Sequence, residues 1–357
     1  MLFTLLGPFA FHLPRATPPL PASRTTTLRA AIPACVPSDK VAELVEPACL
    51  QTLSAIETEQ IELPPTLANG PVTATYARTS VPPAEGVPPV VLLHGFGSSL
   101  ETWRANAPAL VDAGYSVYRL DFLGLGLSEK APGPYSIERW ARQVGAFLDD
   151  QSLDAPVLVG NSIGSLVALQ VASERRVRGL LLNNCAGGMN SKFSGREPSF
   201  TPLQQAVAQV AFAVIDALLA QETLARFIFD RVRSPENVRQ VLGNVYVDGD
   251  RVDATLVDST LLPAEDPKAL AVFVDILTGD PGPRPADLVE RTDAPIHCFW
   301  GDADLLTPLD GPTGLLFRGL ADAGRCSLTI AHAGHVPHDD APAAANADYV
   351  AWLRTLA

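Results

Sequence analysis

The sequence has few of the features that hold metals, nucleotides or disulfide frameworks. Its cysteines are five, an odd number, and none forms a C-x-x-C motif: Cys35, Cys49, Cys185, Cys298 and Cys326. Histidine and acidic residues show no H-x-x-E-H spacing, and the glycine-rich residues 121–128 are followed by no lysine or acid at the spacing of a nucleotide site. We therefore expect reduced, buried thiols, no metal and no cofactor.

Long apolar runs and positive charge are also scarce. No stretch reaches the ~18 uninterrupted apolar residues that a membrane-spanning helix needs, although 47% of the residues are hydrophobic. Lys and Arg number 26 against 39 Asp and Glu, which gives a formal net charge of −13. Nucleic acid would be repelled by this charge. At 357 residues the chain is long enough for one large domain with an insertion.

Acidic residues are absent before Asp39. The first 38 residues are rich in Ser, Thr, Ala and Pro, and their only basic residues are Arg15, Arg24 and Arg29. This composition is typical of an organellar transit peptide, so we expect residues 1–38 to be a plastid-type targeting segment. The apolar residues 1–11 lack a basic n-region. They are either a short signal peptide, which would make the leader bipartite as in secondary plastids, or part of an N-terminus without structure.

A strand, a tight turn and a helix are predicted in succession around Ser162. Residues 156–159, Pro-Val-Leu-Val, indicate a short buried strand, and residues 166–172 indicate a helix. The turn between them, residues 160–164, reads Gly-Asn-Ser-Ile-Gly and matches G-x-S-x-G. In this context the pattern indicates a nucleophile elbow, where only glycine fits at the two crowded positions and the serine has a strained backbone.

A serine hydroxyl is a weak nucleophile at neutral pH, so it needs a base, an acid that orients the base, and donors for an oxyanion. The predicted strand 296–300 runs into Gly-Asp-Ala-Asp at 301–304, and the strand-like residues 327–330 precede a histidine-rich segment at 332–338. The predicted strand 90–93 runs into a His-Gly-Phe-Gly turn. We expect the backbone amides of Phe96 and Ile163 to form the oxyanion hole.

These four motifs, in this order, resemble the α/β-hydrolase superfamily from about residue 88 to the C-terminus. The resemblance implies an α/β fold, with a mostly parallel central sheet, helices on both faces and a helical cap. It implies a first part of the core at residues 50–186, a cap at 187–283 and a second part of the core at 284–357. Before the parallel strands, alternating residues at 56–63 and 72–77 suggest an antiparallel hairpin.

The resemblance also selects among the acids and histidines. The family places its acid at the end of a G-x-x-D turn and its base in a G-H motif, which implies a triad of Ser162, Asp304 and His335. Asp302 is then expected to be a turn residue, and His338 is the second choice for the base. The resemblance gives His94 the role of shaping the oxyanion loop. Two further histidines, His297 and His332, lie in strand-like runs and are expected in the core.

Residues 187–283 contain no clear strand and are predicted to form a helical lid over Ser162. Its residues 203–229 are apolar around most of a helix, so this helix is either covered on two sides or faces lipid. We favour a helix buried between cap and core. Peripheral contact with a thylakoid membrane would run through the apolar surface of the lid and would survive high salt, because the net charge is negative.

Several segments are similar to plant and algal pheophytinase-like hydrolases and to the chlorophyll dephytylase branch: residues 94–99, 103–104, 182–190, 277–283, 300–312 and 334–340. Ser165 departs from a glycine in many of these relatives. The similarity implies a plastid serine hydrolase that cleaves the phytyl ester of chlorophyll or pheophytin. Two further functions stay open, a general carboxylesterase or lipase acting on plastid lipids, and a slow-turnover ligand receptor. For either kind of esterase the partner is a hydrophobic ester.

Overall fold

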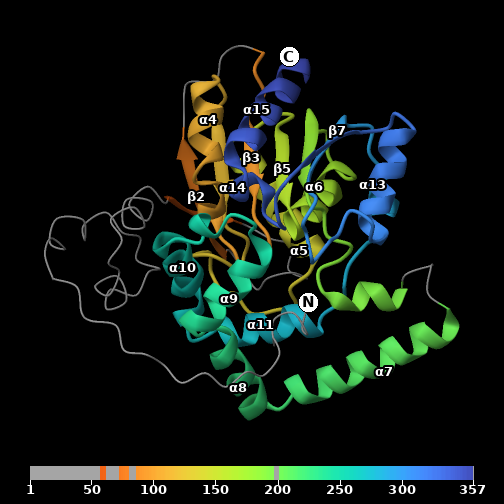
Figure 1. Cartoon of the computed structure of the whole chain (residues 1–357). Helices are drawn as coiled ribbons and strands as arrows, with labels where there is room; N and C mark the ends of the chain where they lie inside the picture. The colour runs from red at the N-terminus through yellow and green to blue at the C-terminus, as the bar shows by residue number, and fades with distance from the viewer. Residues whose placement is uncertain (1–56, 62–71, 80–85, 197–200, 357) are drawn as a thin grey trace, which may run out of the picture.

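A single sheet of eight strands forms the centre of the protein (Figure 1). The computed structural model describes residues 57–61, 72–79, 86–196 and 201–356, so the predicted targeting segment lies outside the described residues. The strands follow one another across the sheet in the order β1-β2-β4-β3-β5-β6-β7-β8. Their bounds are β1 Glu57–Ile61, β2 Val72–Thr79, β3 Val90–Leu93, β4 Val117–Leu120, β5 Val157–Asn161, β6 Gly179–Asn183, β7 Ile296–Gly301 and β8 Ser327–Ala331.

The strand pairing confirms a mostly parallel sheet. β1 and β2 form the predicted antiparallel hairpin, and β2 also pairs antiparallel with β4. All pairs from β4 through to β8 are parallel. The carboxyl ends of β3, β5, β6 and β7 therefore meet at one edge of the sheet, where ligands bind in open α/β sheets.

Each face of the sheet has its own hydrophobic core. Along β3, Val91 and Leu93 belong to one core, whereas Val90 and Leu92 belong to the other, and all four are fully buried. This is the two-residue period of a strand. Because both faces are covered, a central strand needs apolar residues at every position, and its sequence is a continuous apolar run.

Helices cover both cores. The core that contains Val91 is covered by α5 Ile137–Asp150, α6 Ile163–Ala172, α12 Pro285–Val289 and α13 Pro312–Asp322. The opposite core is covered by α4 Asn106–Asp112 and α15 Pro342–Leu353. Short helical turns complete the core of the fold: η1 Leu100–Trp103, α14 Pro337–Asp340 and η5 Arg354–Leu356. Helix α5 begins at Ile137, where the Ser136 hydroxyl caps it by accepting a hydrogen bond from the backbone N–H of Arg139.

Residues 100–112 form two elements, η1 and α4, and not one continuous helix. Pro108 explains the break, because it has no N–H to donate to the carbonyl of Arg104 in a continuous helix. α4 begins at Asn106, which places Pro108 in the first turn, where no intrahelical donor is required.

Between β6 and β7 the described chain is helical. Its elements are η2 Ser191–Arg196, α7 Pro202–Leu219, α8 Glu222–Val232, α9 Pro235–Val245, η3 Gly249–Arg251, α10 Ala254–Leu261, η4 Leu262–Glu265 and α11 Ala269–Thr278, followed by α12. Figure 1 shows α8, α9, α10 and α11 grouped below the sheet, with α7 lying along the outer side of this group. We refer to η2 through α11 as the cap.

The long apolar helix predicted at 203–229 is divided into α7 and α8, and the prediction that it is buried is wrong for α7. Leu219 is the only buried residue of α7. Among the described residues the helix touches η2, α8 and α11 along one side, and Figure 1 shows no described element over its other side. Within the described residues, α7 is also the one helix whose length and composition would allow it to cross a membrane.

Candidate active site

Ser162 lies at a sharp turn between β5 and α6. Its backbone has φ 56° and ψ −119°, a conformation that L-residues rarely adopt. A Cβ atom at position 160 would overlap the backbone of Ser165, and one at position 164 would overlap the carbonyl of Leu93. The two glycines are therefore sterically required, as the G-x-S-x-G pattern predicts. The turn presents the Ser162 side chain at the carboxyl edge of the sheet.

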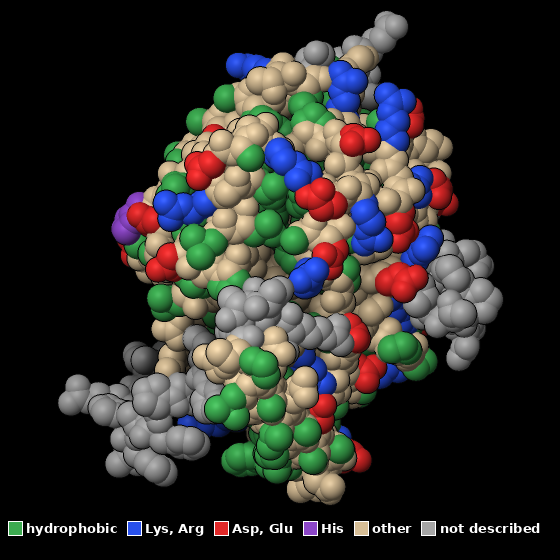
Figure 2. Space-filling view, turned by 90° about the vertical axis from the view of Figure 1, so that its right-hand side faces the viewer, with side chains coloured by type: hydrophobic (Ala, Val, Ile, Leu, Met, Phe, Trp, Pro, Cys, Tyr) green, Lys and Arg blue, Asp and Glu red, His purple; other side chains and the backbone are tan. Residues whose placement is uncertain are grey.

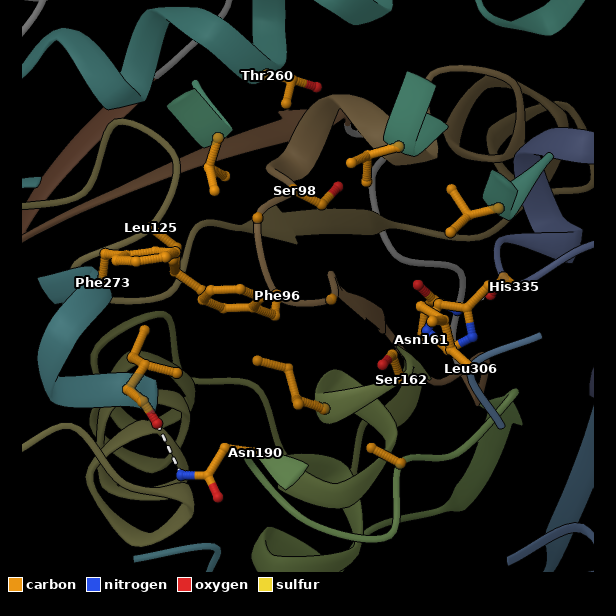
Figure 3. A pocket seen from close by; sticks show the side chains of 18 of the residues that line it. Phe96, Ser98, Leu125, Asn161, Ser162, Asn190, Thr260, Phe273, Leu306 and His335 are labelled. Carbon is orange, nitrogen blue, oxygen red and sulfur yellow. Dashed lines mark hydrogen bonds between the residues drawn. The ribbon is translucent and has the colours of Figure 1, made fainter. Parts of the chain in front are cut away.

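His335 and Asp304 are brought together from segments after β8 and β7. His335 Nδ1 lies 2.9 Å from Asp304 Oδ2 and both residues are buried. An acceptor on Nδ1 fixes this nitrogen as the N–H donor and leaves Nε2 free to accept a proton. In Figure 3 the His335 ring and the Ser162 side chain lie beside each other on the same wall of the cavity, next to Asn161 and Leu306.

Asp304 is held as a carboxylate by groups from three segments. Thr307 Oγ1 donates to Oδ2 over 2.6 Å, and the backbone N–H of Leu306 donates to Oδ1 over 2.7 Å. The side-chain amide of Asn184 also donates to Oδ2. Burial by itself would raise the pKa of Asp304, but the interaction with His335 and the hydrogen bonds from Thr307 and Asn184 bring the pKa below its usual range. The carboxylate is thus charged when it faces the imidazole.

Asn184 and Thr307 were not assigned a role from the sequence. Asn184 has a positive φ of 43° directly after β6, and its Oδ1 accepts the backbone N–H of Gly301 over 3.0 Å. It thereby joins the end of β6 to the turn that contains Asp304. Its position could have indicated this role. Asn184 directly follows a buried strand, β6, whose end lies beside β7 in the sheet.

Ser162 and His335 open onto a cavity of about 470 Å³. Its walls come from the sheet edge and from the cap and are mainly apolar. Figure 3 shows Phe96, Leu125 and Phe273 facing the same space as Ser162. Other apolar lining residues come from α8, α9 and α11: Phe229, Val232, Val241, Leu242, Val272 and Ile276. A cavity of this size and lining suits an apolar chain attached to a reacting group.

The sequence profile of the alpha/beta hydrolase family matches residues 90–348. This range includes the elbow, the turn at 301–304 that contains Asp304 (the acid turn) and the loop at 332–336 that contains His335 (the histidine loop). The chain belongs to the α/β-hydrolase family. Epoxide hydrolase B of Mycobacterium tuberculosis is 36% identical over 128 residues, which make up 35% of this chain and 34% of that protein. Haloalkane dehalogenase 2 of Mycobacterium bovis is 35% identical over 134 residues, or 36% of this chain and 46% of that protein. The matches thus span less than half the length of these relatives.

Solved structures show the same fold. Bromoperoxidase from Bacillus anthracis superposes with a TM-score of 0.62 at 17% identity, covering 84% of this chain and 100% of that chain. A thermophilic esterase from Thermogutta terrifontis gives a TM-score of 0.60 at 20% identity, covering 84% of this chain and 98% of that chain. At these identities the likeness concerns the α/β-hydrolase fold alone.

The backbone amides of Phe96 and Ile163 remain the predicted oxyanion donors of this α/β-hydrolase. Both residues line the cavity beside Ser162. Ile163 is the first residue of α6, so its N–H belongs to the helix N-terminus, where backbone donors have no intrahelical partner. The positive end of the helix dipole adds to the attraction for an oxyanion there.

His94 lies between the turn that contains Phe96, the predicted oxyanion donor, and the loop after β4. Its Nδ1 lies 2.7 Å from the carbonyl of Gly95, and its Nε2 accepts the backbone N–H of Phe122 over 3.1 Å. These two contacts require a neutral ring with the proton on Nδ1. Burial lowers the pKa of His94, which is consistent with a neutral structural residue. The ring thereby joins the turn after β3 to the loop after β4.

His338, the second choice for the base, lies outside the cavity. Its ring stacks on Trp103 with centroids 4.0 Å apart, and Nε2 lies 2.9 Å from Thr102 Oγ1. Complete burial lowers the pKa of His338 to about 3. Because its ring faces Trp103 and does not line the cavity, His338 cannot take the proton of Ser162. It packs η1 against the histidine loop.

Asp302 and two further histidines also lie away from the cavity. Asp302 lies in the turn after β7, as expected, and its carboxylate contacts the exposed ring of His332 over 3.0 Å at the surface. The expectation of a core position is wrong for His332, which is 75% exposed beyond the end of β8. His297 is a core residue as predicted, with Nδ1 2.7 Å from Ser327 Oγ and Nε2 beside Asp348.

The thiols follow the expectation in part. Cys185 and Cys298 are free and buried, whereas Cys326 is only partly buried. Cys35 and Cys49 lie outside the described residues. In the part of the chain that the structure describes, no three or more His, Cys, Asp or Glu side chains are grouped as metal ligands would be. Ser165, the departure from the relatives' pattern, donates to the carbonyl of Asn183 over 3.2 Å and makes no contact with Asp304 or His335.

The loop that carries His335 is attached directly to the cap. The backbone N–H of His335 donates to the carbonyl of Val245 at the end of α9, over 2.8 Å. A Cβ atom at position 334 would overlap this carbonyl, so Gly334 is required for the close approach. The Asp340 carboxylate accepts three backbone N–H groups, from Gly334 over 2.6 Å and from Val247 and Asp248 over 2.9 Å each. One carboxylate therefore connects the histidine loop to the cap.

A second buried carboxylate reinforces this attachment. Asp339 accepts hydrogen bonds from Tyr246 Oη over 2.8 Å and from the guanidinium of Arg104 over 3.1 and 3.2 Å, and it contacts Arg251. Arg104 also forms a bidentate pair with Asp253 at the start of α10. Two arginines and a tyrosine thus compensate the charge of a carboxylate that has no access to water. The segment at 245–253 is fixed to the core beside His335.

Proposed function

We propose that this α/β-hydrolase is a serine esterase that cleaves the long-chain, phytyl ester of a chlorophyll-type pigment. The observation that carries the proposal is Ser162 at a strained elbow, beside a buried Asp304–His335 pair and at the wall of an apolar cavity. A base with an ordered tautomer next to a serine is the arrangement that nucleophilic acyl transfer requires.

The identity of the nucleophile favours esters over the substrates named for the relatives. A serine that opened an epoxide or displaced a halide would form an ether, which has no carbonyl for water to attack. An acyl group on the same oxygen forms an ester, which water removes through a tetrahedral intermediate. Ser162 therefore supports turnover of carboxylic esters, whereas an epoxide or a haloalkane would leave the enzyme alkylated.

The cavity and the sequence motifs support the choice of ester. About 470 Å³ lined by Phe96, Leu125 and Phe273 accommodates an apolar chain next to Ser162. The similarity to pheophytinase-like hydrolases suggests that the ester belongs to a chlorophyll-type pigment, because those hydrolases cut the phytyl ester of such pigments. A shared fold supports a substrate by analogy. Turnover of the pigment itself is therefore the deciding measurement.

In the proposed first step, His335 Nε2 takes the proton of Ser162 while the serine oxygen forms a bond to the propionate carbonyl carbon. The carbonyl oxygen becomes an oxyanion held by the amides of Phe96 and Ile163. The intermediate then collapses: the bond to the phytol oxygen breaks, and His335 gives its proton to that oxygen. Asp304 stabilises the charged imidazole while it holds the proton.

In the second step water replaces the alcohol. His335 takes a proton from water as the water oxygen adds to the acyl carbon. The second oxyanion collapses with cleavage of the acyl–Ser162 bond, and His335 returns the proton to the serine oxygen. The products are phytol and the free propionic acid of the pigment. All proton transfers in this route are made by residues of this chain.

Hydrolysis of chlorophyll a and pheophytin a by the full chain tests the proposal, with the dephytylated pigment read in the polar phase. Ser162→Ala should abolish labelling by a fluorophosphonate and reduce turnover by roughly 10⁶. Ser165→Ala is the matched control. Ser165 lies three residues after Ser162, in the first turn of α6, and its replacement should keep both labelling and turnover. Labelling that persists in Ser162→Ala would contradict the assignment of the nucleophile.

Two other functions are separated by the same assay. A general carboxylesterase or lipase acting on plastid lipids would hydrolyse acyl esters such as p-nitrophenyl esters and glycerolipids but neither pigment. A slow-turnover ligand receptor would label at Ser162 and hydrolyse none of these esters. Turnover of an epoxide or haloalkane without labelling of Ser162 would overturn the ester chemistry altogether.

A further inference from the structure

Helix α7 has its apolar residues on the outside. Five large apolar side chains are between 46% and 74% exposed and follow one another along one face: Leu203, Val207, Val210, Val214 and Leu218. Four exposed alanines share this face: Ala206, Ala211, Ala213 and Ala217. The only charged residue of the helix, Asp216, points to the inner side, where it forms an ion pair with Lys192 over 2.7 Å.

The spacing of the five large residues, at i, i+4, i+7, i+11 and i+15, makes this a continuous stripe. We refer to these five residues as the α7 stripe. A helix of 18 residues is about 27 Å long. Single exposed leucines and valines are ordinary on a protein surface, but a contiguous uncharged stripe of this length marks an interaction site. Figure 2 shows hydrophobic side chains gathered at the lower end of the molecule, where α7 lies in Figure 1.

The α7 stripe lies one side-chain layer away from the cavity. On the inner face of α7, Ile215 and Leu219 belong to the same apolar cluster as Phe229 and Phe273. Both phenylalanines line the cavity that contains Ser162. Helix α7 is therefore the outer layer of the apolar cavity wall, and whatever binds the stripe comes close to the space that receives the substrate.

We propose that the α7 stripe docks the enzyme on the hydrocarbon surface of a lipid bilayer. This proposal rests on the proposed function in one respect, which is the benefit of docking. A phytyl ester is dissolved in membranes, and the cavity beside the stripe would receive it there. The pairing of Asp216 with Lys192 and the contacts of Leu219 hold α7 against the rest of the cap. The helix therefore lies in the plane of the membrane interface and does not cross it.

A lipid surface fits the stripe better than a protein with polar contacts does. Protein interfaces form about one hydrogen bond per 100–200 Å², whereas the five stripe side chains have no donor or acceptor and no charge. Lipid hydrocarbon needs neither. The protein also has a net charge of −13, so attraction to anionic headgroups cannot provide the binding. Burial of apolar surface must provide it, and binding should not weaken when salt is added.

Flotation of the full chain with phosphatidylcholine vesicles that contain no pigment tests the docking. The variant Leu203→Gln/Val207→Gln/Val210→Gln/Val214→Gln replaces exposed residues with a good helix former. We expect the vesicle-bound fraction of the wild-type chain to be the same at about 0.1 M and about 1 M salt, and the partition coefficient of the variant to fall at least tenfold. The matched control is Leu315→Gln, an equally exposed leucine on α13, which should float like wild type.

Hydrolysis of a water-soluble short ester, p-nitrophenyl butyrate, should be equal in wild type and variant, which shows that the fold and Ser162 are intact. Wild type that does not float, a variant that floats as well as wild type, or binding released by salt would overturn the proposal. A dimer that the variant dissociates, together with no flotation, would assign the stripe to a second copy. Because the vesicles hold no substrate, flotation without pigment turnover would contradict only the proposed function.

Discussion

At the scale of single residues, Ser162 has an unfavourable backbone conformation that the neighbouring chain stabilises. A positive φ at a non-glycine residue costs on the order of 1–3 kcal/mol. The backbone N–H of Ser162 donates to the carbonyl of Asn183 over 2.9 Å, and its carbonyl accepts from Ala186 over 3.1 Å. The segment after β6 therefore holds the elbow from both sides, and its Asn184 holds Asp304 as well. One short segment stabilises the serine and the acid together.

The two aspartates of the acid turn should differ sharply when each is replaced by asparagine. Asp304→Asn removes the acceptor of His335 Nδ1–H and should lower kcat by roughly 10⁴. Asp302→Asn is the matched control: within the described part of the chain the Asp302 carboxylate pairs with the exposed ring of His332, so this change should leave kcat unchanged. Steady-state hydrolysis of a p-nitrophenyl ester measures both. A larger loss in Asp302→Asn would reverse the assignment of the acid.

His338 should make the protein sensitive to acid. Its pKa is about 3 when folded and about 6.5 when unfolded, so the unfolded chain binds the extra proton. The corresponding stability is present above about pH 6.5 and is lost as the pH falls toward about 3. Between pH 7.5 and 4.5 the loss from this group is on the order of 3 kcal/mol.

Urea unfolding at both pH values tests this linkage. His338→Gln should start from a lower stability at pH 7.5, because the contact with Trp103 is lost, but should lose less on acidification than wild type. His332→Gln replaces an exposed histidine and should stay close to wild type at both pH values. An equal acid loss in wild type and His338→Gln would show that the buried ring does not contribute.

At the scale of elements, the histidine loop and the cap form one structural unit. The loop after β8 contains His335, and α14 directly after it contains Asp339 and Asp340, both of which bind cap residues. The cap end near Val245 therefore cannot move without disturbing the backbone hydrogen bond of His335. On the other side of the cap, the contacts of α7 with the described elements η2, α8 and α11 lie along one face. We expect opening of the cavity to take place there.

Asp340→Asn should affect catalysis as well as stability. An asparagine side chain has one acceptor oxygen and cannot accept all three N–H groups that the carboxylate binds. Each hydrogen bond to a charged group that is lost costs about 1.5–3 kcal/mol of folding free energy. We expect a lower unfolding midpoint and a fall in kcat of about 10- to 100-fold well below that midpoint, with KM little changed, because a misplaced base costs about this much. Asp230→Asn, at an exposed ion pair on α8, is the control. Full kcat in folded Asp340→Asn would exclude a positioning role.

At the scale of the whole molecule, an acidic enzyme combines an apolar cavity with an uncharged outer stripe. The net charge of −13 becomes −16 if residues 1–38, with their three arginines, are removed. Such a surface favours solubility and repels nucleic acid and anionic headgroups. In the proposed docking, contact with a membrane is limited to the α7 stripe, and the position of α7 beside the cavity wall sets the orientation of the enzyme on the membrane.

The targeting segment is tested by a fusion of residues 1–50 to a fluorescent protein. We expect import into plastids, because the segment up to residue 38 has basic and hydroxylated residues and no acid. N-terminal sequencing of the mature protein should place its first residue between about residues 30 and 40. Substitution of Arg15, Arg24 and Arg29 by glutamate is the control and should abolish import. A fusion that remains in the cytosol would contradict plastid targeting.

Local patterns in the sequence were sufficient for the sheet and for much of the site. The strands at 90–93, 157–161 and 296–301 are buried on both faces, so each is a short apolar run that can be recognised without its neighbours. The elbow could be recognised because steric crowding permits only glycine at two positions. Asp304 and His335 could be named because the family resemblance places them in defined turns.

Long-range packing decided the rest. The contacts of Asn184 with Asp304 and of Asp340 with Val247 join residues 120 and 93 positions apart, and no local pattern encodes such a distance. His332 and His338 occur in one short histidine-rich segment, yet one is exposed and the other completely buried, because only the latter faces Trp103. In the same way α7 has the composition of a buried helix. Only the tertiary structure shows that its apolar side is exposed, since burial depends on which elements pack against a face and not on the residues within it.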